Sequence, residues 1–172
     1  MSTLPLRLAR PWLALALLVL LLAACRADGR ELRGEVLWIY DGDTLKVEGV
    51  GKVRLIGVDT PERGDSDRDN FFVKLGIPKK NLRKGSGAAL HFNIANVKGK
   101  TVKLTFDREE KDRHGRTLAY LTLPDGRLLN RLLLEEGLAV VYRRFDFRYK
   151  DDFLAAEAEA KRKGVGLWAR DP

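Results

Sequence analysis

The segment LRGEVLWIYDGDTLKVEGVGKVRLIGV, residues 32–58, decides the fold of this chain. Three parts of it alternate apolar with polar positions and are rich in β-branched and aromatic residues, which is typical of strands. These parts are residues 32–40, 44–48 and 52–58. The turns between them contain glycine, and Gly42 is free to take a positive φ in the first turn. The segment therefore predicts a β-meander of three strands.

Two further strands and three helices are predicted after the meander. The strands are residues 101–106 and 118–123, and the helices are residues 84–97, 128–136 and 150–163. Each helix has apolar residues three and four positions apart and is followed closely by a glycine that can end it. Residues 138–142 are predicted as a short buried strand or an extended run, and Leu167 with Trp168 is expected to pack back on the body.

Residues 61–82 are charged and interrupted by glycine and proline, so they are predicted as a long loop. Loops of this length are uncommon in small domains and are usually functional or mobile. Phe71, Phe72 and Leu75 must pack against something, so part of this loop is expected to cover a groove.

The order of the elements indicates the fold class. Five strands, with one helix after the third and two at the end, contain no parallel βαβ repeat, which argues against a doubly wound sheet. We expect an α+β, mainly β fold: a five-stranded OB-type barrel with Greek-key connections and three helices. A chain of 172 residues is long enough for one such domain, which we assign to residues 32–170.

Acidic and arginine side chains gather in three short motifs at the ends of the predicted strands. The motifs are DGDT at 41–44, RLIGVDTPE at 54–62 and DRHGR at 112–116. Grouped carboxylates suit a hard divalent cation, and the fork of an arginine suits the oxygens of a phosphate. A metal ion, two arginines and a further carboxylate are the groups that hydrolysis of a phosphodiester requires.

These motifs, in this order and at this spacing, resemble those of the thermonuclease, or staphylococcal nuclease, family. The resemblance extends over about residues 32–170 and includes LN at 129–130 and EGLA at 136–139. It implies a five-stranded OB barrel with three helices. It also implies a Ca²⁺-dependent endonuclease that cuts DNA and RNA at the P–O5′ bond to leave 3′-phosphates. Because the candidate ligands are all oxygens, Mg²⁺ or Mn²⁺ could serve in part.

The resemblance further implies a role for each acidic motif residue. Asp43 and Asp59 would bind Ca²⁺ through their carboxylates, and Thr60 would bind it through its backbone carbonyl. Glu62 would position or activate the attacking water, and Asp41 would lie just behind the metal. Taken alone, Asp41 and Asp43 would more often be ordinary turn residues, and Asp59 could be one too, so these roles depend on the motifs occurring together.

The same resemblance implies a set of substrate contacts. Arg54 and Arg116 would bind the scissile phosphate and neutralise the charge that develops on it. Arg113 and His114 would contact the substrate nearby, with His114 at a position where the family often has tyrosine. Tyr142 would stack on a base, although packing at the edge of the core is an equally good interpretation.

Residues 1–25 are predicted to be a targeting segment. Two arginines precede an apolar run at 12–24, which is shorter than the roughly 20 residues of a membrane-spanning helix. The run ends in LAAC at 22–25, which resembles a bacterial lipobox, so Cys25 is expected to be lipidated and to become the new N-terminus. An ordinary secretory signal or an uncleaved anchor is the alternative. Residues 26–31 would form a tether.

We therefore expect an exported, monomeric nuclease held by its lipid on the periplasmic face or the surface of a bacterial envelope. The 32 Lys and Arg against 24 Asp and Glu give a formal charge of +8, which favours polyanions such as DNA and RNA. The single cysteine excludes an intrachain disulfide. Two alternatives remain: a non-catalytic nucleic-acid-binding OB-fold lipoprotein, and an envelope lipoprotein whose basic surface faces anionic lipid or polysaccharide.

Overall fold

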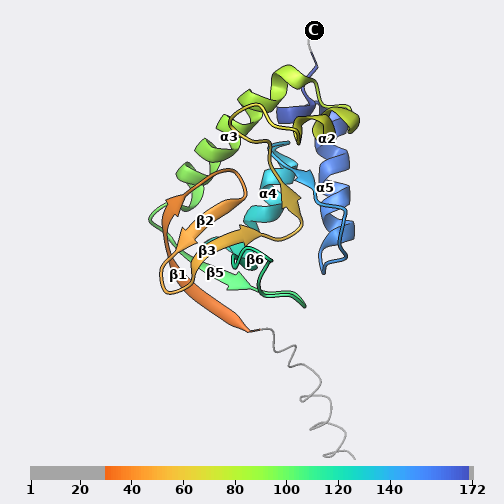
Figure 1. Cartoon of the computed structure of the whole chain (residues 1–172). Helices are drawn as coiled ribbons and strands as arrows, with labels where there is room; N and C mark the ends of the chain where they lie inside the picture. The colour runs from red at the N-terminus through yellow and green to blue at the C-terminus, as the bar shows by residue number, and fades with distance from the viewer. Residues whose placement is uncertain (1–29, 171–172) are drawn as a thin grey trace, which may run out of the picture.

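The computed structural model describes residues 30–170, so the targeting segment and the lipidation predicted at Cys25 lie outside the described residues. Five strands close into a barrel in the order β1-β2-β3-β6-β5 (Figure 1). They are β1 Glu31–Ile39, β2 Thr44–Val47, β3 Gly51–Leu55, β5 Thr101–Thr105 and β6 Thr117–Thr122. Every neighbouring pair is antiparallel except β3 and β6, which are parallel. The predicted five-stranded OB-type barrel is confirmed.

The third predicted strand, residues 52–58, is wrong at its C-terminal end. β3 stops early, and the chain turns through Gly57 at a φ of 77°. A side chain there would also collide with Phe147, because a Cβ would lie 2.6 Å from its ring. After this turn, β4 (Val58–Asp59) leaves the barrel and pairs antiparallel with β7 (Val140–Val141), which is the short strand expected after the second predicted helix.

The described residues form four α-helices and one short 3₁₀ helix. They are α2 Asp69–Lys74, α3 Lys79–Val97, α4 Leu129–Glu135, α5 Lys150–Lys163 and η1 Gly166–Trp168. The prediction for residues 61–82 as a loop is wrong in part, because this segment contains α2 and the start of α3. α3 begins directly after Pro78, whose fixed φ and missing N–H suit the start of a helix.

A second hydrophobic cluster explains why the segment before α3 is ordered. Phe72 of α2 is fully buried with Leu82 of α3, and both pack with Leu167 and Trp168 of η1. Phe72 therefore packs as expected, whereas Phe71 points to the surface. Figure 1 shows α2 and the C-terminal segment together at the top of the molecule, away from β5.

The interior of the barrel is filled by apolar side chains. Leu45, Val53, Leu104 and Leu121 come from four different strands and have no exposed surface. Burial of this kind supplies most of the free energy that holds such a barrel closed. Within residues 30–170, no helix has the length and apolar character needed to cross a membrane.

Candidate active site

Asp43 is fixed in the turn between β1 and β2, where it is almost fully buried. Its carboxylate accepts hydrogen bonds from the backbone N–H and the hydroxyl of Thr60, at 3.0 and 3.2 Å, and from the hydroxyl of Thr44 at 2.9 Å. Gly42 does not take the positive φ that we expected. It is required by space instead, because a Cβ would lie 2.7 Å from the side chains of Ala89 and Thr60. The turn is thereby pressed against α3.

Arg54 of β3 connects Asp43 to Asp59 of β4. Its guanidinium contacts one oxygen of Asp43 and donates to Asp59 at 2.8 Å, so two buried carboxylates share one cation. Burial alone would lower the pKa of Arg54, but the two carboxylates outweigh it and raise that pKa. Burial raises the pKa of the Asp43 carboxyl, against the opposing effect of Arg54. Asp41 lies behind Asp43 and accepts its backbone N–H at 3.0 Å.

Arg68 is a residue of this site that sequence reasoning missed. It lies immediately before α2, and its guanidinium contacts the second oxygen of Asp59 and, at 3.5 Å, the carboxylate of Glu62. Its side chain is 43% exposed, so it covers the carboxylate cluster from the solvent side. No motif marks Arg68, because it stands among many other charged residues between 63 and 70. Only the unusual length of the segment indicated a functional role.

The donor atoms in this cluster fit the metal ion that the resemblance implies. The atoms here that could bind a metal are the carboxylate oxygens of Asp43 and Asp59, and a hard cation such as Ca²⁺ prefers oxygen ligands. Thr60 follows Asp59 and donates its N–H to Asp43, so its backbone lies against both carboxylates. Among residues 30–170, no group of three His, Cys, Asp or Glu side chains is arranged to hold a metal. Backbone oxygen and water would therefore have to complete the ligand set.

Arg116 comes to the same outer face through the parallel pairing of β3 with β6. Arg54 pairs with Leu118, so Arg116, two residues earlier, lies diagonally across from Arg54. The Nε of Arg116 donates to Asp112 at 2.6 Å, and its backbone N–H donates to the same carboxylate at 3.0 Å. Burial by itself would raise the pKa of Asp112, but these hydrogen bonds and one from the backbone of His114 outweigh it and hold that pKa below its usual value.

The remaining predicted substrate contacts lie at the surface around this cluster. Arg113 and His114 are exposed in the turn before Arg116, where the Nε of Arg113 donates to His114 at 3.1 Å. Tyr142 directly follows β7, and its backbone N–H donates to the carbonyl of Gly57 at 2.9 Å. This places Tyr142 beside β4, which carries a predicted metal ligand. Its role on a substrate base remains a prediction.

The fold and the site together define a class of protein: an OB-fold barrel in which one arginine joins two buried carboxylates at the end of the strands. The model of the family of staphylococcal nuclease homologues matches residues 52–170. The chain belongs to this family.

Individual relatives resemble the chain over most of its length. A thermonuclease of Staphylococcus intermedius is 36% identical over 171 residues, covering 92% of this chain and 94% of the relative. An uncharacterised protein of Methanocaldococcus jannaschii is 41% identical over 147 residues, covering 78% of this chain and 70% of the relative. A protein of Escherichia coli described as an uncharacterised endonuclease is 29% identical over 143 residues, covering 81% and 78%.

Proposed function

We propose that this protein is a Ca²⁺-dependent nuclease that hydrolyses phosphodiester bonds of DNA and RNA and leaves 3′-phosphate ends. The observation that carries the proposal is the joining of Asp43 and Asp59 by Arg54, with Arg116 diagonally across on the neighbouring strand. Membership of the family and the names of the thermonuclease and endonuclease relatives support the same class of reaction.

The two arginines would bind the phosphate that is cut. Arg54 lies in β3 and Arg116 directly before the adjacent β6, both on the outside of the barrel, and a guanidinium can contact two phosphate oxygens at once. The side chain of Arg116 is already oriented by the hydrogen bond from its Nε to Asp112, so less side-chain entropy is lost when it binds. Fixed positive groups of this kind stabilise the charge that accumulates on the oxygens of the transition state.

Asp43, Asp59 and the backbone of Thr60 would hold the Ca²⁺ ion. When bound, this ion would supply further positive charge to the phosphate and to the water that attacks it. Glu62 is 49% exposed on its side chain and only loosely paired with Arg68, so it is free to accept a proton from that water. The water oxygen would attack phosphorus as its proton passes to Glu62, and the P–O5′ bond would break. The leaving O5′ would take a proton from solvent, which yields a 3′-phosphate and a 5′-hydroxyl.

The decisive experiment incubates the full chain, purified in detergent, with single- and double-stranded DNA and RNA in Ca²⁺, Mg²⁺ or chelator. We expect Ca²⁺-dependent cutting, with 3′-phosphates identified by end-group analysis. Arg116→Gln should lower the rate at least about a hundredfold. Arg127→Gln is the matched control, because Arg127 makes the same two contacts with Asp125 at 3.0 and 2.9 Å in a different turn.

Two outcomes would contradict the proposal. Full activity of Asp43→Ala would show that the predicted metal site is not the one used. An absence of cutting in every metal, with salt-sensitive binding of nucleic acid retained, would favour the non-catalytic binding protein instead.

From the sequence, we also propose that the protein is exported, anchored by a lipid on Cys25 and monomeric. In a bacterial host, the wild-type protein should fractionate with membranes and incorporate labelled fatty acid. Cys25→Ser should do neither. Light scattering in detergent should give the mass of one chain with its bound detergent, and a dimer mass would contradict the monomer.

A further inference from the structure

A row of cationic and aromatic side chains crosses three neighbouring strands on the outside of the barrel and ends directly before a fourth, β6. Trp38 of β1 pairs in register with Lys46 of β2, and Lys46 pairs with Lys52 of β3. The parallel register of β3 with β6 begins with Val53 opposite Thr117, so continuing it by one residue brings Arg116 next to Lys52. We call these four residues the cross-strand row. One end of the row is therefore an arginine of the candidate active site, and the other end is an exposed tryptophan.

An irregularity in β1 turns Trp38 outward. Val36 and Ile39 both face the core, although strict alternation along a strand would put them on opposite faces. The register with β2 shifts between Val36 and Trp38, so Leu37 is the extra residue of a β-bulge. Bulges commonly re-aim a side chain beside a functional site. Here the bulge leaves Trp38 on the same outer face as the lysines.

Each exposed ring on this face has a lysine over it. The Nζ of Lys98 lies 5.2 Å from the ring centroid of Trp38, and the Nζ of Lys52 lies 4.5 Å from that of Tyr40. These pairs stabilise the rings but do not bury them, since 54% of Trp38 and 39% of Tyr40 remain exposed. The face thus offers flat apolar surfaces and positive charges side by side. Successive bases and phosphates of an unpaired strand present the complementary groups.

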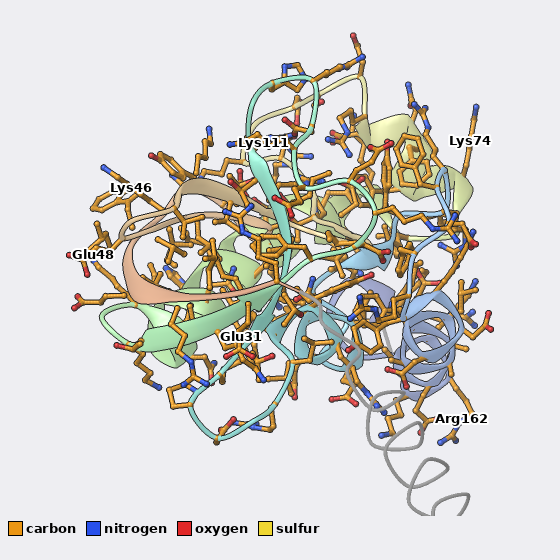
Figure 2. All side chains as sticks on the ribbon, turned by 90° about the horizontal axis from the view of Figure 1, so that it is seen from below. Glu31, Lys46, Glu48, Lys74, Lys111 and Arg162 are labelled. Atoms are coloured by element: carbon orange, nitrogen blue, oxygen red, sulfur yellow. The ribbon has the colours of Figure 1, made fainter. Side chains whose placement is uncertain are left out.

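The charge on the two sides of the row, along the β2–β3 hairpin, is opposite in sign. Figure 2 shows Lys46 and Glu48 near one another at one edge of the molecule, and Glu48 belongs to the turn that follows β2. This carboxylate would repel a phosphate, so it limits the positive surface at the tip of the β2–β3 hairpin. In the opposite direction along the hairpin, away from its tip, Arg54 follows Lys52 on the same face of β3. A polyanion on the row is therefore directed toward the candidate active site.

We infer that the cross-strand row binds single-stranded nucleic acid, holding the nucleotides adjacent to the phosphate that is cut. This inference rests on the proposed function, because the active site defines where the bound strand continues. Three strand spacings separate Arg116 from Trp38, or roughly 14 Å. That is about four nucleotides at the rise of about 3.4 Å per base in a stacked strand. A duplex fits less well, because its bases are already stacked on one another and leave no face for Trp38.

The test measures binding to the full chain in chelator, so that no cutting occurs. The probes are a ten-nucleotide oligo(dT), its duplex with oligo(dA), and the dinucleotide dTpdT. Among the described residues, Trp38 is exposed and Trp168 is buried. Quenching of tryptophan fluorescence by the oligonucleotide, if it disappears in Trp38→Phe, therefore reports contact at the row. We expect Trp38→Ala to weaken binding of the decamer about tenfold and Trp38→Phe to weaken it much less. Binding of the dinucleotide should not change.

A charge-matched pair of variants tests the lysines. Lys46→Gln should reduce the slope of log Kd against log salt by about 0.7 for the single strand. Lys74→Gln, on α2 and far from Lys46 in Figure 2, should leave that slope unchanged. Trp38 and Lys46 are exposed, so circular dichroism and thermal melting should show both variants folded as the wild type.

Two results would overturn the inference: decamer binding that Trp38→Ala leaves unchanged, or binding of the duplex as tight as that of the single strand. These results are distinguishable from a failure of the proposed function. If Trp38→Ala weakens binding but the wild type cuts nothing in any metal, the row stands and the nuclease proposal fails. If the wild type cuts and Trp38→Ala binds and cuts the decamer normally, the row fails and the nuclease proposal stands.

Discussion

Arg54 is the residue on which the candidate site depends most. It is the cation between Asp43 and Asp59, both of which are almost completely buried. Two carboxylates without a compensating cation are costly in such a place, because each loses its hydration and repels the other. Arg54 therefore serves the stability of the free protein as well as the binding of a phosphate.

Replacing Arg54 should destabilise the protein most when no metal is present. We expect Arg54→Gln to lower the free energy of unfolding by about 3 kcal/mol in chelator, and saturating Ca²⁺ should restore part of it. Urea unfolding with and without Ca²⁺ measures both effects. Arg127→Gln, which removes an exposed arginine, should change stability by less than about 0.5 kcal/mol. An Arg54→Gln protein as stable as the wild type in chelator would contradict this account.

Arg68 should compete with a metal ion for Asp59. In the structure its guanidinium occupies one oxygen of that carboxylate and lies near Glu62. We therefore expect Arg68→Gln to bind Ca²⁺ a few-fold more tightly than the wild type, and Arg68→Lys to lie between them. Calorimetric titration of Ca²⁺ measures the affinities directly. Weaker binding by Arg68→Gln would show instead that Arg68 supports the metal site.

At the scale of the elements, the sequence predicted those with a strong period and missed those that depend on distant contacts. Alternation of apolar and polar residues predicts the strands β1, β2, β5 and β6. Helical spacing of apolar residues, with a glycine after the last turn, predicts α4 and α5. α2 has only six residues and no cap bond from a side chain, so its local sequence hardly favours a helix. It forms because Phe72 is buried against η1, which follows almost a hundred residues later.

The candidate site divides in the same way. Asp43, Arg54 and Asp59 could be predicted because each lies within a motif at the end of a strand, and the structure brings all three together. Arg68 could not be predicted, because only the fold of the segment before α3 carries it to Asp59. Gly42 was assigned for its flexibility but is required by close packing, which is visible only once α3 is in place.

Asp112, in the turn before β6, should make the stability of the protein depend on pH. The pKa of Asp112 is below its usual value, so the stability that this carboxylate provides is present above about pH 4 and is lost as the pH falls through its folded-state pKa. Asp112→Asn should therefore be about 1.5 kcal/mol less stable than the wild type at pH 7. The difference should disappear at low pH. Urea unfolding between pH 2.5 and 7 tests this, and a constant difference would contradict it.

At the scale of the whole molecule, the second hydrophobic cluster connects the C-terminal segment of the domain to the site. The side-chain amide of Asn81 in α3 donates to the carbonyls of Leu167 and Ala169, at 3.0 and 2.7 Å. The same cluster contains Phe72, four residues after Arg68. The arginine that covers the carboxylates is thus held by packing that involves the C-terminal segment.

Removing the centre of this cluster should therefore affect stability and site together. We expect Phe72→Ala to lower the free energy of unfolding by about 3 kcal/mol, because it leaves a cavity in a fully buried position. It should also shift Ca²⁺ affinity in the same direction as Arg68→Gln. Phe71→Ala is the control. The ring of Phe71 is exposed, so its removal should lower the free energy of unfolding by less than about 1 kcal/mol. An unchanged Ca²⁺ affinity in Phe72→Ala would show that packing in the second hydrophobic cluster does not affect the site.

The parallel pairing of β3 with β6 also determines when a chain becomes able to bind a phosphate. Arg54 and Arg116 are far apart in the sequence and become neighbours only through this pairing, which closes the barrel. Contacts between distant parts of a chain form late in folding, because the intervening loop must first be ordered. A newly made or partly folded chain therefore lacks the pair. For the exported nuclease proposed above, which would be made beside the cell's own DNA and RNA, this delay would protect the cell that makes it.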